Sequence, residues 1–137
     1  MYFNLIVKHF SFLKNIPLIP LVFDLLLILY SFIFRNNIYN LISKLETELL
    51  EWKNVKRVLH KYGGLQFNIN NKELCHLHGN GLVDMIVKND DYLGILNDGI
   101  ATKHHIFKDS NWISLYLKTE LDYNYAIALL KRKFENL

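Results

Sequence analysis

An apolar run near the N-terminus is the feature that most constrains this chain. Between residues 16 and 34 only Asp24 is charged, and Lys14 and Arg35 flank the run. A helix that crosses the hydrocarbon core of a bilayer needs about 20 such residues. Asp24 opposes insertion by about 2.5 to 3.5 kcal/mol, whereas the Leu, Ile and Phe residues after it favour insertion. The run therefore predicts a membrane-inserted or re-entrant segment, and the alternative is a buried helix or helical hairpin of a soluble protein.

This run divides the chain into two parts. We expect residues 1–36 to form a hydrophobic N-terminal anchor and residues 37–137 to form one α+β domain, because 137 residues are too few for two ordinary domains. More Lys and Arg residues follow the run than precede it. The positive-inside rule then predicts a membrane-associated protein whose C-terminal domain lies in the cytoplasm.

Charge and cysteine content exclude several classes of protein. The 16 Lys and Arg residues exceed the 13 Asp and Glu residues by a net charge of only +3, and they are spread along the chain. A nucleic-acid-binding domain is expected to cluster its basic residues on one face, so we expect no nucleic acid among the partners. Cys75 is the only cysteine, which excludes an intrachain disulfide and a zinc site built from cysteines alone.

The apolar pattern after residue 36 predicts an α+β fold. Helical spacing of apolar residues predicts three helices, over about 38–52, 89–99 and 119–134. Alternation of apolar and polar residues, or a short apolar run, predicts four strands, over about 65–69, 72–78, 82–87 and 112–118. The links between the first strands have hairpin length, so the order predicts a small antiparallel sheet packed on one face by helices.

The candidate functional site is centred on His76 and His78. Residues i and i+2 of a strand share a face, so both imidazoles are expected to point the same way. If Asn70–Asn71 forms a two-residue turn, Leu65 and Phe67 of the preceding strand lie on that face too. The histidines would then look toward the side of the sheet that the helices cover.

Three interpretations of this histidine pair are open. The pair can be structural and hydrogen-bonded, it can be half of a divalent-metal site, or one imidazole can accept a proton from a bound substrate without any metal. A zinc or iron site needs a third protein ligand. The candidates for it are His60, Glu73, Asp84, His104 and His105. Glu73 is the weakest of these, because strand alternation puts it on the opposite face.

Three blocks of sequence resemble a known family when they are taken together. They are residues 72–78, the pair His104–His105, and residues 112–116 ahead of the C-terminal helix. In this order they are similar to the luciferase-like domain family, which contains fungal luciferase and many small bacterial proteins. The resemblance runs from about Leu45 to Phe134.

The resemblance implies an oxygenase. Fungal luciferase oxygenates a hydroxylated pyrone, so relatives are expected to hold a small aromatic or enolic substrate and molecular oxygen in a histidine-lined pocket. On this basis His76 and His78 would be the base and its partner, and His105 would complete the pocket. The remaining residues expected to contact a ligand are Glu73, His60, His104, Trp112 and Asp84. The cofactor is either absent or a divalent metal held by His76 and His78.

The rival function is a non-catalytic binding module at the membrane surface. In that case the histidines are structural, and a partner binds the exposed sheet face or the basic end of the last helix, Lys131 to Lys133.

Overall fold

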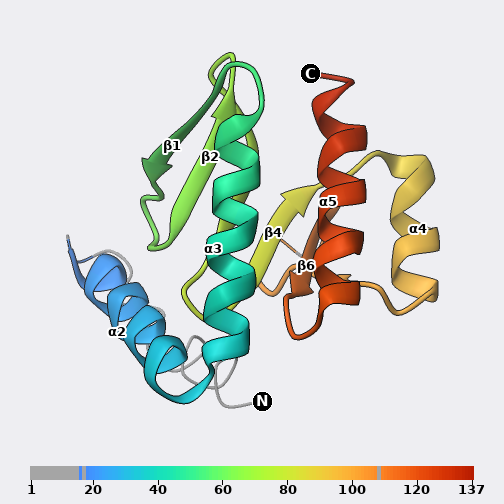
Figure 1. The fold of residues 1–137 in the computed structure, drawn as a ribbon. Coiled ribbons are helices and arrows are strands. Elements are labelled where there is room, and N and C mark those ends of the chain that lie inside the picture. The colour runs from blue at the N-terminus through green and yellow to red at the C-terminus, as the bar shows by residue number, and fades with distance from the viewer. Residues whose placement is uncertain (1–15, 17, 108) are drawn as a thin grey trace.

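The fold is an antiparallel sheet with two long helices against one of its faces (Figure 1). The computed structural model describes residues 16, 18–107 and 109–137, and these residues form four helices and a six-stranded sheet. The predicted α+β class, with a small antiparallel sheet packed on one face by helices, is confirmed.

The elements follow the order that the sequence predicted, with additions at both edges of the sheet. The helices are α2 (Ile19–Phe34), α3 (Asn36–Glu51), α4 (Asn89–Asn97) and α5 (Glu120–Phe134). The strands are β1 (Val55–Leu59), β2 (Leu65–Ile69), β3 (Lys72–Leu77), β4 (Leu82–Ile86), β5 (Thr102–Lys103) and β6 (Trp112–Tyr116), and they lie in the order β1-β2-β3-β4-β6-β5.

The two edge strands were not predicted, for a physical reason. Four of the five residues of β1 are exposed, and β5 has only two residues. An edge strand with no buried face shows no alternation of apolar and polar residues, so the sequence pattern does not predict the strand.

The hydrophobic core lies between the sheet and the helices α3 and α5. Leu45 and Leu49 of α3 are fully buried, and so are Ala126 and Leu130 of α5. They pack in one cluster with the inward-facing residues of the strands, which include Phe67, Cys75, Val83, Ile113 and Leu115. The face of the sheet that carries these residues is therefore the covered one.

A β-bulge in β3 determines which side chains reach the other face. Asn70 and Asn71 form the predicted tight turn with φ of 48° and 64°. Asn68 then pairs with Glu73, but Phe67 pairs with Cys75, so Leu74 is an extra residue.

One extra residue reverses the facing of every residue that follows it. His76 consequently pairs with Gln66 rather than Leu65, and it lies on the face away from α3 and α5. The prediction that the histidines look toward the helix-covered side is wrong. Lys133 of α5 donates a 2.7 Å hydrogen bond to the carbonyl oxygen of Leu74, which holds the bulge against the last helix.

The predicted membrane span over residues 16–34 needs correction. No helix in the described part of the chain is both long enough and apolar enough to cross a membrane. Helix α2 begins at Ile19 and ends at Phe34, so it is about 24 Å long against the roughly 30 Å of a bilayer core. The structure therefore does not support the membrane segment or the membrane-associated localisation drawn from it.

Helix α2 docks on the rest of the protein through polar groups. Ser31 Oγ donates a 2.8 Å hydrogen bond to the carbonyl oxygen of Gly79, and the N–H of Gly79 donates a 3.0 Å bond to Asp24 Oδ1. A Cβ atom on Gly79 would lie 2.5 Å from the backbone nitrogen of Ile28, so only glycine permits this approach.

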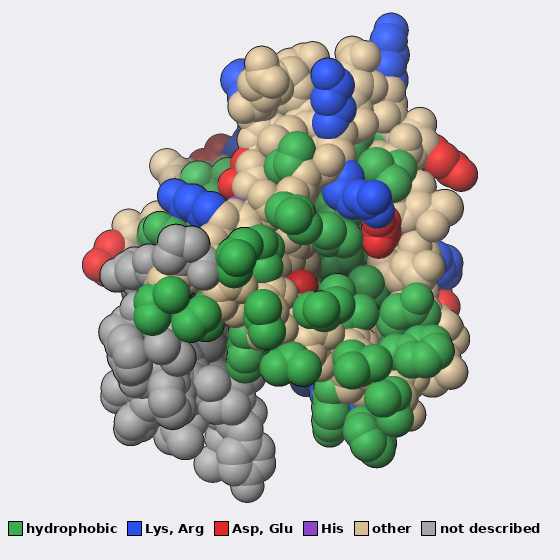
Figure 2. Space-filling view, turned by 90° about the vertical axis from the view of Figure 1, so that its left-hand side faces the viewer, with side chains coloured by type: hydrophobic (Ala, Val, Ile, Leu, Met, Phe, Trp, Pro, Cys, Tyr) green, Lys and Arg blue, Asp and Glu red, His purple; other side chains and the backbone are tan. Residues whose placement is uncertain are grey.

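The opposite side of α2 is apolar and exposed. Figure 2 shows apolar side chains gathered on this face of the molecule, and those of α2 include Val22, Leu25, Leu26, Leu29, Phe32 and Ile33.

Candidate functional site

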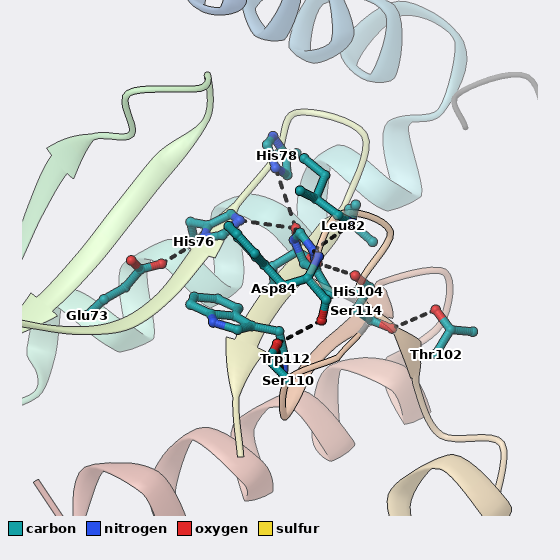
Figure 3. A network of polar contacts seen from close by, with 12 residues as sticks. Glu73, His76, His78, Leu82, Asp84, Thr102, His104, Ser110, Trp112 and Ser114 are labelled. Atoms are coloured by element: carbon teal, nitrogen blue, oxygen red, sulfur yellow. Dashed lines mark hydrogen bonds and ion pairs between the residues drawn. The ribbon is translucent and has the colours of Figure 1, made fainter. Parts of the chain in front are cut away.

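Three imidazoles meet at one buried carboxylate on the face of the sheet opposite α3 and α5 (Figure 3). Asp84 of β4 is fully buried. Its Oδ2 atom lies 3.1 Å from Nε2 of His76, 3.6 Å from Nε2 of His78 and 3.5 Å from Nε2 of His104. We call these four residues the histidine–aspartate cluster.

Cross-strand pairing positions the carboxylate. Asp84 is opposite His76 on β3 and opposite Ser114 on β6. The hydroxyl of Ser114 donates a hydrogen bond to Asp84 Oδ1. Oδ1 is therefore satisfied by the sheet itself, and Oδ2 is turned toward the imidazoles.

Two of the imidazoles are held from behind by carboxylates. Nδ1 of His76 lies 2.6 Å from Glu73 Oε1, and Nδ1 of His78 lies 3.3 Å from Asp24 Oδ1. Glu73 was predicted to lie on the opposite face, which is wrong, because the bulge at Leu74 brings it to the same face as His76. Each of these rings thus has a carboxylate at Nδ1 and directs Nε2 toward Asp84.

His104 is held differently, by the backbone. Its Nδ1 accepts hydrogen bonds of 3.1 Å from the N–H groups of Ile106 and Phe107. An Nδ1 atom that accepts two hydrogen bonds carries no proton, so the ring proton lies on Nε2, on the side of Asp84.

Asp84 Oδ2 has close neighbours but no aligned hydrogen bond. Although three ring nitrogens lie within 3.6 Å, none of them is positioned to donate to Oδ2 in hydrogen-bond geometry. A fully buried carboxylate oxygen without such a bond is unusual and calls for a physical explanation.

The other predicted site residues surround the cluster. His60 stacks on His76 with ring centroids 4.3 Å apart, and Trp112 lies 5.4 Å from the same ring. His105 stacks on His104 at 4.5 Å. The structure therefore brings all of the predicted site residues into one neighbourhood. Their individual roles stay predictions.

The neighbouring charges in the cluster shift the pKa values of its residues in the direction opposite to that expected from burial. Burial would raise the pKa of Asp84, but the imidazoles of His104, His76 and His78 hold it well below its ordinary value. Burial would lower the pKa of His76, but its contacts with Asp84 and Glu73 raise it. The pKa of His78 is likewise raised, to about 9, because Asp24 and Asp84 outweigh the effect of burial. The Asp84 carboxylate is therefore ionised near neutral pH, and the acidic neighbours of His76 and His78 favour the protonated form of both rings.

The two outer histidines have the opposite tendency. Burial and the neighbouring charge of His76 lower the pKa of His60 to about 4. Burial and the neighbouring charge of His104 lower the pKa of His105 to about 4. Nδ1 of His60 is also buried without a hydrogen-bond partner among the described residues.

The clearest cavities lie away from the cluster. A groove of about 600 Å³ runs between α3 and α5 past Lys44, Trp52 and Tyr123. A second cavity, of about 230 Å³, lies beside the end of α5 near Ile86 and Lys133. Neither cavity is lined by a histidine.

Two residues of the site were missed from the sequence. Asp24 was considered only as an obstacle to membrane insertion, and Ser114 was not among the candidate residues. The available signal was Asp24 itself, since a charge within an apolar helix needs a partner when the helix is buried. No local pattern marks Ser114, whose role follows from its place opposite Asp84.

A comparison with known protein families finds one match. Residues 71–133 match the model of the Luciferase domain, and this segment contains the whole histidine–aspartate cluster. No curated protein and no solved structure matches the chain. The resemblance to the luciferase-like domain family that the sequence predicted is therefore found over residues 71–133.

Proposed function

We propose that this protein is an oxygenase that adds molecular oxygen to a small enolic or aromatic molecule beside the histidine–aspartate cluster. The observation that carries the proposal is the convergence of three imidazoles on the buried Asp84 within a luciferase-like domain. Buried groups with perturbed pKa values, gathered at one place, are typical of functional sites.

His60 is the base in this proposal. Its Nδ1 has no hydrogen-bond partner in the described structure, and its ring lies flat against His76. Nδ1 is therefore available to accept the hydroxyl proton of an enol or phenol. The imidazole–carboxylate contacts next to it supply donors for the negative charge that develops on the substrate.

The reaction balances without an outside reductant. Removal of the hydroxyl proton leaves an enolate, whose carbon forms a bond to dioxygen with the enolate electron pair. The O–O π bond breaks, and the distal oxygen takes the proton back. One substrate and one dioxygen give one hydroperoxide.

Partly exposed aromatic residues mark the side from which a substrate approaches. Trp112 and Tyr116 lie on the same face of β6 as Ser114, and both are half-buried. A planar substrate can stack on such a ring with its hydroxyl directed inward.

The test is oxygen uptake by the full-length protein with a panel of hydroxylated pyrones and substituted phenols. We expect uptake with at least one of them, and incorporation of two labelled atoms from ¹⁸O₂ into the product. His60→Gln should lower the rate by about 10² or more. Asp98→Asn, at the exposed position that follows α4, is the matched control and should leave the rate unchanged. No uptake with any compound, or an unchanged rate in His60→Gln, would contradict the proposal.

A non-catalytic binding module is the second candidate. The observation that favours it is that neither of the two cavities described above is lined by a histidine. Its predicted partner surface, the basic end of α5, is partly engaged within the molecule, because Lys131 pairs with Glu48 and Arg132 with Asp91. A stoichiometric protein partner that binds wild type and His76→Gln equally would support this candidate over the oxygenase.

A further inference from the structure

The geometry points to a mononuclear divalent-metal site whose three protein ligands are His76 Nε2, His78 Nε2 and Asp84 Oδ2. These three residues each offer one ligand atom, and the three atoms all lie within 4.8 Å of one another. The site deepens the proposed function, on which the choice of iron among the divalent ions rests.

The distances between the ligand atoms suit one ion. Nitrogen and oxygen ligands bind zinc-sized ions at about 2.0 to 2.2 Å, so two ligands at angles of 90° to 110° are separated by roughly 2.8 to 3.6 Å. Asp84 Oδ2 is 3.1 Å from His76 Nε2 and 3.6 Å from His78 Nε2. Little movement is needed for all three atoms to share an ion.

The groups behind the ligands are those that a metal site requires. A metal-binding imidazole almost always donates its second N–H to a carboxylate, a carbonyl or water. Glu73 takes this place at Nδ1 of His76, and Asp24 takes it at Nδ1 of His78. Both rings are therefore oriented with Nε2 toward Asp84 Oδ2.

The unsatisfied oxygen of Asp84 is the second, independent observation. Oδ2 is fully buried and receives no aligned hydrogen bond from the residues that the structure describes, although Oδ1 is bonded to Ser114. A cation bound at Oδ2 would satisfy this atom.

His104 is a positioning residue rather than a ligand. Its Nδ1 accepts two backbone hydrogen bonds, so its proton lies on Nε2 and that nitrogen has no free lone pair for a metal. From 3.5 Å it orients Asp84 Oδ2.

A neighbouring triad is less suitable. His60, Glu73 and His76 also bring ligand atoms together. However, Glu73 Oε1 and His76 Nδ1 are 2.6 Å apart, a hydrogen-bond distance that is shorter than the ligand separations estimated above. Glu73 is thus better placed behind His76 than beside it on an ion.

The ligand set indicates which ion binds. Two imidazoles and one carboxylate leave coordination positions open, which is typical of non-haem Fe(II) sites that react with oxygen. No thiolate is at hand to favour a structural zinc, since Cys75 faces the core.

The experiment measures binding without any substrate. Full-length protein is stripped with a chelator, loaded with Fe(II) under anaerobic conditions, desalted and analysed by elemental mass spectrometry. We expect one iron per chain in the wild type, and at least a hundredfold weaker binding in His76→Gln, His78→Gln and Asp84→Asn. His105→Gln and His60→Gln are the matched controls and should each retain one iron. His104→Gln should weaken binding by about 10 to 100-fold.

A second measurement keeps the inference testable if the ligand variants do not fold. Electron spin echo envelope modulation of the Mn(II)-loaded wild type should show two coupled imidazole nitrogens. The assignment would be overturned if the spectrum showed fewer or more than two coupled nitrogens, or if the wild type bound less than one iron per chain. It would also be overturned if iron were lost in His60→Gln but not in His78→Gln. Oxygen uptake by the metal-free protein, with no metal bound after loading, would overturn this inference and leave the proposed function intact.

Discussion

At the scale of single residues, Asp84 is the position on which the site depends. A buried carboxylate is costly unless it is paired, and Asp84 is compensated by imidazoles from β3, from the turn between β3 and β4, and from the loop between β5 and β6. The same carboxylate in turn raises the pKa values of His76 and His78.

Asp84→Asn should therefore destabilise the metal-free protein strongly. The substitution removes the negative charge that raises the pKa values of two buried imidazoles, and the loss of one partner of a buried charge pair costs about 3 to 5 kcal/mol. The measurement is urea denaturation of both proteins in the presence of a chelator. Asp98→Asn, which changes an exposed carboxylate, should stay within about 0.5 kcal/mol of wild type. A loss below 1 kcal/mol in Asp84→Asn would show that the carboxylate is not the compensating charge.

His105 should contribute an acid-sensitive component to stability. Its pKa is lowered to about 4 in the folded state, whereas the unfolded side chain has its ordinary value of 6.5. The unfolded state therefore binds more protons between these values, and the stability from His105 is present above pH 6.5 and lost as the pH falls toward 4. In His105→Gln the free energy of unfolding should fall less steeply as the pH drops through this window. The difference in slope corresponds to at most one proton taken up on unfolding. An unchanged slope would contradict the assigned pKa.

At the scale of elements, two local irregularities build the site. The bulge at Leu74 turns His76 and Glu73 onto the same face of the sheet, and Lys133 of α5 holds it in place. The turn at Gly79 lets α2 approach closely enough for Asp24 to reach His78.

Gly79→Ala should separate α2 from this turn. The added methyl group would lie 2.4 Å from Ile28 Cγ1 and 2.5 Å from Ile28 N, which requires a backbone shift. Such overpacking costs about 1 to 3 kcal/mol. We expect faster amide exchange throughout α2.

Gly94→Ala is the matched control for this change. Nothing lies within 4 Å of a Cβ atom at Gly94 in helix α4, so the substitution should be neutral or stabilise the protein by about 0.5 to 1 kcal/mol. Unchanged exchange in α2 of Gly79→Ala would show that the helix does not depend on the close approach.

At the scale of the whole molecule, the site and the core lie on opposite faces of one sheet. The residues of the site come from four separate parts of the chain. They are Asp24 of α2, His76 of β3, Asp84 of β4 and His104 of the β5–β6 loop. Their convergence requires the entire sheet, so the cluster and the core should be lost together.

Leu45→Ala in α3 tests this coupling. The side chain is fully buried, and its truncation should cost about 2 to 5 kcal/mol. The two tryptophans report on different faces, since Trp52 packs on Phe134 and Trp112 lies beside His76. Trp52→Phe leaves only the fluorescence of Trp112, and Trp112→Phe leaves only that of Trp52. When Leu45→Ala is added to each, both signals should show the same lowered urea midpoint.

The control for this change is Leu93→Ala, at a position that is 66% exposed, and it should leave both midpoints in place. Separate midpoints for the two tryptophans in Leu45→Ala would show that the faces unfold independently.

Local sequence by itself determined the types and order of most elements. The three predicted helices and four predicted strands are present, with the Thr119–Asp122 capping box and the Asn70–Asn71 turn, because periodicity, caps and turns depend on residues close in the chain. The residues of the cluster were also recognisable, since imidazoles two apart on a strand share a face.

Tertiary structure alone decided where those residues point and what they meet. The facing of His76 depends on a pairing register with β2, and the register is shifted by one residue at Leu74. Asp24 finds His78 across 54 positions of sequence, and Asp84 is placed by pairing with both β3 and β6. Register and long-range docking depend on contacts between distant segments, which no local pattern encodes.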